Sequence, residues 1–455
     1  MRHFDAIFIG AGQAAPFLAA RMAAEGRKVA LVERKHLGGT CVNSGCMPTK
    51  TLVASARAIA VTRSAGEYGA IFGGPIDVDL KVVKGRAQTV INNGQAGLKR
   101  WFDSVETMEV IFGHARFNSP CTIVVGSELL TAPQIFINVG ARPRIPDING
   151  IGQVPYLTST SIINLEHVPA HLVIVGGSYI ALEFAQMYRR FGSEVTILER
   201  GRRLARREDE DISICIEDIL RSDGITIHTN VGEISLHTEG EAKIVSSTSG
   251  RTIAFTDLLI AVGRKPNTDD LALELAGVNT DEHGFIRVDD KLSTNVPGIW
   301  ALGDCNGRGA FTHTAYNDFE IVAANLLDGE DRKLSDRILG YALYIDPPLG
   351  RAGLTEREAR ELGREIVVSK RLMSSVGRAL ERGETRGLMK LVADAKTKQI
   401  IGAAILGVEG DEAIHGILNA INMRTPYDAL KWAVPIHPTV SELIPTLIGG
   451  LRPTH

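Results

Sequence analysis

The segment DAIFIGAGQAAPFLAARMAAEGRKVALVER, from Asp5 to Arg34, contains the pattern that decides the fold. A short apolar run leads into a glycine turn, a helical pattern follows, and a second apolar run ends in Glu-Arg. This order predicts a β-strand, an α-helix and a second, parallel β-strand. Glycines in the turn let the backbone approach a pyrophosphate, which then lies at the N-terminus of the helix. The segment therefore predicts a dinucleotide-binding unit.

A second segment, HLVIVGGSYIALEFAQMYRRFGSEVTILER from His171 to Arg200, repeats the same order. The spacing from the first glycine to the terminal acid is identical in the two copies, Gly10 to Glu33 and Gly176 to Glu199. We expect each of these glutamates to accept hydrogen bonds from ribose hydroxyls. The second copy departs from the usual motif, because Ser178 occupies the place of the second glycine. The repeat predicts two separate dinucleotide sites.

The composition is that of an ordinary globular protein, with 44% hydrophobic and 23% charged residues. A length of 455 residues predicts about three domains. The net charge of −3 gives no indication of a nucleic-acid or membrane partner. No apolar run reaches the roughly 18 residues of a membrane span, and the apolar run near the N-terminus is too short for a signal peptide. Five scattered cysteines do not form a secreted disulfide framework, so we expect a cytoplasmic protein.

The segments around the two repeats predict further α/β structure. A helical period runs from about Pro48 to Arg63, and short strands and turns are expected from there to about residue 145. The turn-rich stretch NVGARPRIPDING, residues 138–150, is typical of a crossing between domains. A charged stretch at residues 328–337 marks another boundary, and the last 110 or so residues mix strand and helix patterns.

Two of the five cysteines, Cys41 and Cys46, lie in the segment GGTCVNSGCMPTK. Half of a zinc site is one alternative, but no second cysteine pair exists. Inert buried thiols are another, but the flanking glycines argue against the interior of a helix or strand. Pro48 fits the first turn of a helix, which places Cys46 near a helix N-terminus, where the dipole favours a thiolate. The spacing also permits a disulfide, and Lys50 adds a cation one turn along.

This segment resembles the redox signature of the class I pyridine nucleotide-disulfide oxidoreductases, which include glutathione reductase, dihydrolipoamide dehydrogenase and mercuric reductase. The resemblance covers essentially the whole chain and includes VGRKPN at residues 262–267, LGD at 302–304 and IHPTVSE at 436–442. It implies FAD at the first repeat, NAD(P)H at the second, and a homodimer. The implied fold is α/β, with two Rossmann-like domains and a C-terminal α+β dimerisation domain.

The resemblance also implies where the domains begin and end. We expect the first part of the FAD-binding domain at residues 1–147 and the NAD(P)-binding domain at 148–265. The second part of the FAD-binding, or central, domain is expected at 266–335. The dimerisation domain then takes residues 336–455.

By the same resemblance, electrons pass from NAD(P)H to FAD, to the Cys41–Cys46 disulfide and on to an acceptor. Cys46 is implied to lie next to the flavin and to form the charge-transfer thiolate, and Cys41 to attack the acceptor. Lys50 is implied to lie near flavin N5 and to pair with Glu183, because a cation there stabilises the reduced ring.

His437 is implied to be the acid and base of the reaction, oriented by Glu442. In the family this pair comes from the partner subunit. The chemistry needs such a group, because a departing thiolate must be protonated.

The resemblance implies further cofactor contacts along the chain, and no ligands for a resident metal. The implied FAD contacts are Gly10, Gly12, Ala15, Glu33, Thr40, Lys50, Ala115, Gly140, Asp304 and Ala315. The implied contacts to the nicotinamide cofactor are Gly176, Ser178, Ile180, Glu199 and Gly263.

One residue, Glu199, indicates which nicotinamide cofactor is preferred. Glu199 favours a free ribose 2′-hydroxyl and hence NADH. The nearby Arg200, Arg202, Arg203 and Arg206 are an alternative site for a 2′-phosphate, although a solvated loop is the favoured explanation of these arginines.

The electron acceptor is the least determined part of the prediction. We expect a small molecule or small disulfide, since the chain keeps His437. Reduction of Cu(II) or Hg(II) by the same dithiol is the alternative, because thiolates suit both kinds of acceptor. FTHTAYNDFEIV at residues 311–322 and DPPLGRAGLTEREAR at 346–360 resemble the bacterial subgroup of the reactive-chlorine-resistance flavoenzyme, which is linked to copper(II) reduction. A slow redox sensor or a structural flavoprotein subunit is a rival of another class.

Overall fold

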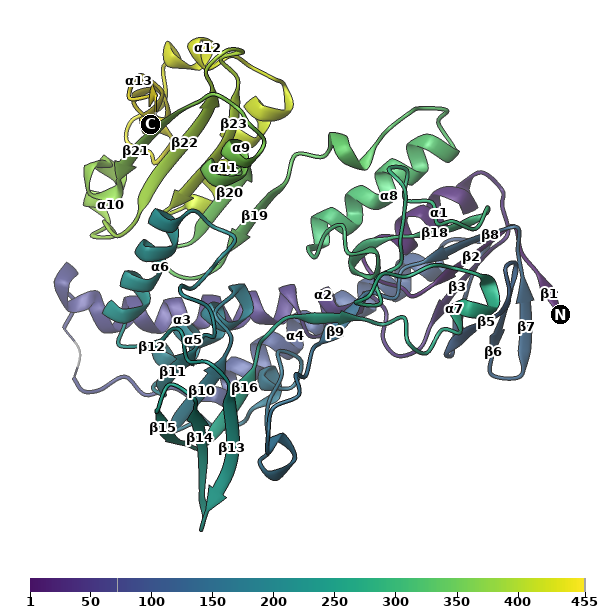
Figure 1. Cartoon of the computed structure of the whole chain (residues 1–455), viewed down its shortest axis with the longest axis horizontal. Coiled ribbons are helices and arrows are strands. Elements are labelled where there is room, and N and C mark those ends of the chain that lie inside the picture. The colour runs from purple at the N-terminus through teal and green to yellow at the C-terminus, as the bar shows by residue number, and fades with distance from the viewer. Residues whose placement is uncertain (72, 454–455) are drawn as a thin grey trace.

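We describe the protein from a computed structural model of the chain, in which residues 1–71 and 73–453 are described. Figure 1 shows three parts of the molecule, each built around a large sheet. The N-terminal sheet lies on the right, and the second and C-terminal sheets lie on the left, one below the other. Two long helices, α3 (Cys46–Ser64) and α4 (Leu80–Asp103), run from the first sheet towards the other two.

The first sheet is parallel and has its two faces covered by different elements. Its strand order is β18 (Ile299–Ala301), β8 (Gln134–Ile137), β2 (Ala6–Ile9), β3 (Val29–Glu33) and β4 (Met108–Phe112). Phe8 packs with α1 (Ala15–Ala24) and α8 (Thr312–Leu326) on one face. Ile7 and Ile9 pack on the other face. The alternation of strand side chains thus explains why β2 is apolar throughout.

A small mixed sheet, mostly antiparallel, covers that second face. Its order is β1 (Arg2–His3), β7 (Glu128–Thr131), β6 (Thr122–Val125) and β5 (Ala115–Ser119), next to the short helix α7 (Leu273–Ala276). The first dinucleotide unit is therefore the core of a complete layered domain.

The second sheet repeats this arrangement around the other dinucleotide unit. Its order is β12 (Thr226–His228), β11 (Glu194–Leu198), β10 (His171–Val175) and β16 (Asp257–Ile260), all parallel. Helices α5 (Tyr179–Phe191) and α6 (Glu210–Ser222) pack on one face, together with residues of α3 and α4. The other face packs against the antiparallel β13 (Ile234–Glu239), β14 (Ala242–Ser247) and β15 (Thr252–Phe255).

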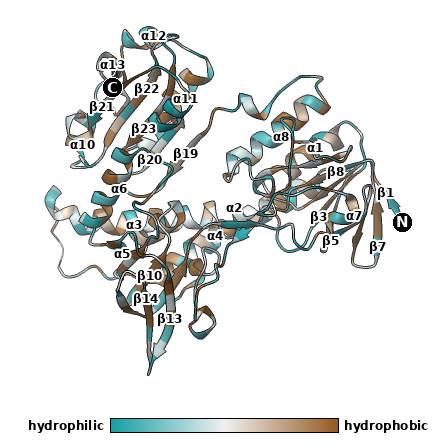
Figure 2. Cartoon of the chain, in the orientation of Figure 1, coloured by the Kyte–Doolittle hydropathy of each residue, from teal (hydrophilic) through white to brown (hydrophobic). Residues whose placement is uncertain are grey.

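The C-terminal sheet is antiparallel. Its order is β19 (Gly340–Leu343), β20 (Leu349–Gly353), β23 (Ile400–Leu406), β22 (Leu388–Asp394), β21 (Ile366–Leu372) and β24 (Arg452–Pro453). The helices of this part are α9 (Glu356–Glu361), α10 (Gly377–Glu381), α11 (Gly410–Asn422), α12 (Tyr427–Lys431) and α13 (Ile444–Gly449). Figure 2 shows hydrophobic residues concentrated on the strands, and every residue of β22 and β23 is buried. The predicted fold class is thus confirmed.

The chain crosses twice between the first two sheets, and the two crossings lie side by side. β9 (Ala141–Pro143) carries the chain out and pairs antiparallel with β17 (Arg264–Pro266), which carries it back. After this return the chain adds β18 to the first sheet. The domain limits at residues 147, 265 and 335 stay predictions.

Two details of the predicted secondary structure are wrong. Residues 80–103 form the long helix α4, where the sequence predicts short strands and turns. Three glycines and two adjacent asparagines weaken the helical signal, but Asp79 caps the helix and buried apolar residues hold it. Cys41 lies inside a short helix, α2 (Gly39–Asn43), where the flanking glycines predict a loop. Here the packing of the chain outweighs the low helix propensity of glycine.

Candidate active site

The two cysteines lie where α2 and α3 meet. Cys41 is within α2, and Cys46 is the first residue of α3, as the sequence predicts. Both are free thiols. The hydroxyl of Thr312, the first residue of α8, lies 3.1 Å from Cys46 Sγ. Two helix N-termini therefore meet at one sulfur, which favours a negative charge on it.

The two thiols differ in how readily they ionise. The pKa of Cys46 is lowered to about 6, chiefly by its hydrogen bond with Cys41 and also by Thr312 and the charge of Lys50. The pKa of Cys41 is raised, mainly by the same hydrogen bond and by burial. Of the pair, Cys46 is therefore the thiolate at neutral pH, and Cys41 keeps its proton.

Lys50 and Glu183 form an ion pair between α3 and α5. Lys50 Nζ lies 2.6 Å from Glu183 Oε2, and the carboxylate side chain is only 5% exposed. The other oxygen of Glu183 accepts a hydrogen bond from the backbone N–H of Tyr344 at 3.0 Å. A nearly buried carboxylate needs such partners, since an unpaired charge there is costly. The structure thus brings together Cys41, Cys46, Lys50 and Glu183 from three helices.

The first glycine turn lies against Asn138, which the sequence analysis did not identify. The backbone N–H of Ala15 donates to Asn138 Oδ1 at 3.1 Å, and Asn138 Nδ2 donates to the carbonyl of Leu302 at 2.8 Å. A Cβ at Gly12 would lie 2.9 Å from Asn138 Oδ1, so a glycine is required there. The available signal was a polar residue directly after a buried strand, at the carboxyl edge of a parallel sheet.

The remaining predicted FAD residues surround this turn. Glu33 Oε2 accepts from the backbone N–H of Ala11 at 2.9 Å, so the acid borders the turn. Gly113, two residues before Ala115, donates its backbone N–H to the Glu33 carbonyl at 2.9 Å. Gly140 follows Asn138 with a left-handed φ of 65°, and Thr40 lies in α2.

The loop before α8 reaches the same place. A Cβ at Gly303 would lie 2.9 Å from Asn138 Nδ2 and 3.3 Å from Ala315. Asp304, the next residue, lies 3.3 Å from Arg264 Nε, and burial raises the pKa of its carboxyl group. Segments from three distant parts of the sequence therefore converge on one glycine turn. Such a small-residue cradle at a helix N-terminus fits the pyrophosphate of FAD.

The second glycine turn has the same plan. Glu199 Oε1 accepts from the backbone N–H of Gly201 at 2.5 Å. A Cβ at Gly177 would lie 2.8 Å from Glu199 Oε2, so the acid packs directly on the turn. Ser178 is the N-cap of α5 but makes no side-chain cap bond, and Ile180 lies in the first turn of that helix.

The first glycine of this turn, Gly176, lies close to the residues that follow β16. A Cβ at Gly176 would lie 2.5 Å from the carbonyl of Ala261. Gly263, two residues on, accepts a backbone hydrogen bond from Arg144 at 2.9 Å. The residues predicted for the nicotinamide cofactor thus border one turn, at the carboxyl ends of β10 and β16.

His437 and Glu442 contact each other but not the rest of the predicted site. His437 Nδ1 lies 2.8 Å from Glu442 Oε2. The side chain of His437 is 80% exposed, whereas that of Glu442 is 11% exposed. In Figure 1 the segment between α12 and α13 lies at the far end of the C-terminal part, away from α2. Within one chain, the structure does not bring the histidine to the cysteines.

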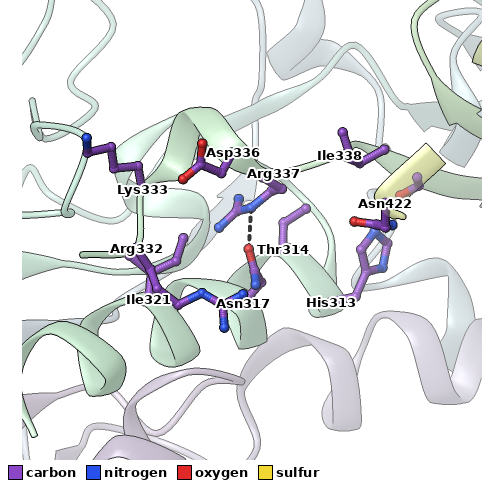
Figure 3. Close-up of a pocket in the computed structure, with 11 residues that line it drawn as sticks. His313, Thr314, Asn317, Ile321, Arg332, Lys333, Asp336, Arg337, Ile338 and Asn422 are labelled. Atoms are coloured by element: carbon purple, nitrogen blue, oxygen red, sulfur yellow. Dashed lines mark hydrogen bonds between the residues drawn. The ribbon is translucent and has the colours of Figure 1, made fainter. Parts of the chain in front are cut away.

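The described residues lack two other features, a membrane-spanning helix and a cluster of potential metal ligands. None of their helices is long and apolar enough to cross a membrane, and no group of three or more His, Cys, Asp or Glu side chains forms a potential metal site. Figure 3 shows a polar pocket beside α8, where Arg337 Nε donates to Asn317 Oδ1 at 2.7 Å. None of the predicted site residues lines it.

The sequence places this chain in a known enzyme family. Residues 4–318 match the family described as pyridine nucleotide-disulphide oxidoreductase, and residues 340–448 match the dimerisation domain of that family. The chain therefore belongs to this family and is an oxidoreductase that uses FAD and NAD(P)H, as predicted.

Curated relatives match over nearly the whole chain. The probable pyridine nucleotide-disulfide oxidoreductase RclA of Escherichia coli is 36% identical and covers 99% of this chain and 100% of its own length. A mercuric reductase of Streptomyces lividans is 35% identical, with 94% and 92% covered, and a dihydrolipoyl dehydrogenase of Bacillus subtilis is 33% identical, with 96% of both covered. A solved Cu(II) complex of the HOCl-induced flavoprotein disulfide reductase RclA matches with a TM-score of 0.90, 35% identity and 99% of both chains covered.

Proposed function

We propose that this enzyme passes electrons from NAD(P)H through FAD to a Cys41–Cys46 disulfide and on to a small disulfide acceptor. NAD(P)H, a proton and one organic disulfide would give NAD(P)⁺ and two thiols. The observation that carries the proposal is the place of Cys46 at the N-terminus of α3, with its Sγ 3.1 Å from the Thr312 hydroxyl and Lys50 one helical turn further on. These surroundings lower the pKa of Cys46, whereas burial helps to raise that of Cys41. When bound, FAD supplies the two-electron chemistry that links the nicotinamide to the dithiol.

In this proposal each side chain has one task. Cys41 loses its proton to a base and attacks the acceptor disulfide, forming a mixed disulfide and releasing one thiolate. The protonated base then donates its proton to that thiolate. Cys46 thiolate next attacks Cys41 Sγ, which restores the Cys41–Cys46 disulfide and releases the second thiolate, and that thiolate takes up the proton consumed in the overall reaction from solvent. Lys50 compensates negative charge near the Cys46 end of α3.

We assign the base to His437 of the partner subunit and therefore propose a homodimer. The dimerisation domain of the family supports this, and so do the exposed apolar side chains next to the histidine. Trp432 is 80% exposed, Val434 95% and Ile436 79%. Large apolar side chains so close together on a surface are typical of a contact with another chain.

Reduction of Cu(II) is the second candidate. The RclA structure of Escherichia coli that matches this chain is a Cu(II) complex, which favours a metal-ion acceptor. Two Cu(II) ions would each take one electron from the Cys41 thiol and Cys46 thiolate, giving two Cu(I) ions, a disulfide and one proton. Thiolates bind Cu(I) well, and no leaving thiolate needs a proton. Mercuric reductases among the relatives support Hg(II) in the same way.

We further propose NADH as the preferred coenzyme and the cytoplasm as the location. Glu199 lies on the second glycine turn, where its charge would repel a 2′-phosphate. Arg206 also lies beside Gly201, so a preference for NADPH would point to this arginine as the group that binds the 2′-phosphate. The odd number of cysteines, with Cys121, Cys215 and Cys305 scattered singly, supports a reducing compartment.

A panel of acceptors tests the function. The FAD-loaded enzyme is mixed with NADH or NADPH and with glutathione disulfide, lipoamide, dithionitrobenzoate, Cu(II), Hg(II), quinones or oxygen. We expect the highest kcat/KM with NADH and an organic disulfide. A higher value with Cu(II) or Hg(II) would replace the disulfide by a metal ion. A rate of coenzyme oxidation that no acceptor increases would favour a sensor or a structural subunit.

A further inference from the structure

Tyr344 contacts both members of the Lys50–Glu183 ion pair, and no motif points to it. It follows β19 directly, so it belongs to the C-terminal part of the chain. Its backbone N–H donates to Glu183 Oε1 at 3.0 Å, while Glu183 Oε2 lies 2.6 Å from Lys50 Nζ. Lys50 Nζ in turn lies 4.6 Å from the centroid of the Tyr344 ring. The three residues form a closed triangle of contacts.

The segment that carries Tyr344 is tied to α5 by a second set of bonds. Gln186, one helical turn after Glu183, accepts from the backbone N–H of Asp346 at 2.6 Å and donates to its carbonyl at 2.9 Å. Two side chains on one face of α5 therefore bind alternate backbone N–H groups, as a neighbouring strand would. These bonds set the position of the Tyr344 backbone.

The side chain of Asp346 ties the same segment to α3. Its carboxylate lies 2.8 Å from Arg57 Nη1 on α3 and 2.6 Å from Arg190 Nη1 on α5. The Asp346 side chain is 15% exposed, so both ion pairs are partly buried. The segment thus contacts both helices, and the ring of Tyr344 lies beside Lys50 of α3.

The ring matters because Lys50 is a flexible side chain that one ion pair holds only loosely. An aromatic face attracts a nearby ammonium group, and more strongly where water is partly excluded. Lys50 is 34% exposed, so its ammonium group is in such a place. Burial above all raises the pKa of the Tyr344 hydroxyl, so the ring is neutral and does not cancel the charge of Lys50.

We propose that Tyr344 is a positioning residue of the redox centre, whose ring and backbone N–H hold Lys50 and Glu183 in place. Lys50 follows Cys46 by one helical turn, so it lies on the same side of α3 as the sulfur. The C-terminal part would then contribute to the redox centre of its own subunit, besides the histidine that it offers to the partner. The kinetic consequence rests on the proposed function, but the effect on Cys46 does not.

The first experiment measures the ionisation of Cys46 in the FAD-loaded enzyme. Tyr344→Leu removes the aromatic face, and Tyr344→Phe, the matched control, keeps it. Each variant is reduced and alkylated with iodoacetamide at a series of pH values, and fragmentation of the peptide 36–50 separates Cys46 from Cys41. We expect the midpoint of Cys46 alkylation to move to higher pH in Tyr344→Leu and to stay at the wild-type value in Tyr344→Phe.

The second experiment measures turnover and the dependence on Lys50. We expect Tyr344→Leu to lower kcat about 2- to 30-fold, the range of a cation–π contact, with little change in the KM of the acceptor. In a Lys50→Met background the same substitution should change neither kcat nor the midpoint further. Tyr344→Met, which fills the space with a flexible chain, repeats the test if the leucine variant does not fold.

Three results would overturn the proposal. The first is a wild-type midpoint of Cys46 alkylation in both Tyr344→Leu and Tyr344→Met. The second is a loss of kcat in Tyr344→Phe equal to that in Tyr344→Leu. The third is a shift of the alkylation midpoint that persists in the Lys50→Met background. The alkylation midpoint needs no acceptor, so a failure of the acceptor panel would leave it unaffected. The two proposals can therefore fail separately.

Discussion

The redox cysteines and the histidine segment differ in how much of their surroundings one chain supplies. Cys46 has a thiol, a hydroxyl and an ammonium group around it, from α2, α8 and α3. His437 has a single partner, Glu442, and an 80% exposed side chain. One subunit thus supplies the surroundings of the proposed redox cysteines, whereas the proposed acid–base residue lies on an open surface. We therefore expect the role of His437, but not the surroundings of Cys46, to depend on assembly of two chains.

The largest effect is expected at the cysteines. Cys46→Ser should reduce turnover of a disulfide to background, because the dithiol can no longer form its internal disulfide. The measurement is NADH oxidation with dithionitrobenzoate. Cys121→Ser is the matched control, since Cys121 is an exposed thiol outside the site, and it should keep wild-type activity. Activity left in Cys46→Ser would remove the dithiol from the mechanism.

Replacement of the histidine should have the next largest effect, and one that depends on the acceptor. His437→Gln should lose about 100- to 10,000-fold in turnover of an organic disulfide, the usual scale for acid–base catalysis. With Cu(II) the loss should be far smaller, because no thiolate has to be protonated. Stopped-flow traces of the two half-reactions separate these cases, and reduction by NADH should hardly change. An equal loss with both acceptors would contradict the acid role.

Mixed dimers test whether His437 acts on the cysteines of the partner subunit. His437→Gln and Cys41→Ser chains, each inactive alone, are unfolded together and reassembled. If the histidine acts on the partner's cysteines, half of the dimers gain one intact site, and about a quarter of the wild-type activity returns. If both residues act within one chain, no activity returns, and the histidine segment would have to reach the cysteines of its own subunit.

Removal of the carboxylate behind the histidine should have a moderate effect. Glu442→Gln replaces a charged acceptor 2.8 Å from His437 Nδ1 by a neutral one. A hydrogen bond to a charged group contributes enough for a loss of about 10- to 100-fold in disulfide turnover. An unchanged turnover would show that Glu442 only packs.

The smallest effect is expected at Thr312. Thr312→Val removes one hydrogen bond to the Cys46 thiolate, worth about 1 kcal/mol, so the pKa should rise from about 6 by less than one unit. Because a raised pKa leaves less thiolate at a given pH, alkylation of Cys46 should need a higher pH. Asn317→Val, on the same helix, should leave the midpoint unchanged. A fall in the midpoint would mean that the hydroxyl does not donate to the sulfur.

Local patterns were sufficient for the elements that contain a strong motif. The two repeats predicted both strand–helix–strand units, and Pro48 with its glycine neighbours placed Cys46 at the start of a helix. Helix α4 was missed, because its glycines and asparagines hide a helical period that burial of Leu80 and Val83 supports. Asn138 was missed because a single polar residue after a strand has no signature of its own.

The sequence by itself determined the family and the two strand–helix–strand units, and it predicted the redox cysteines, because each depends on residues close together in the chain. Local spacing sets a turn or a helix start, so those features can be recognised without the fold. The tertiary structure alone decided that Thr312 contacts Cys46, that Asn138 supports the first glycine turn and that Tyr344 covers Lys50. These contacts join residues more than 100 positions apart, and the packing of separate sheets and helices creates them.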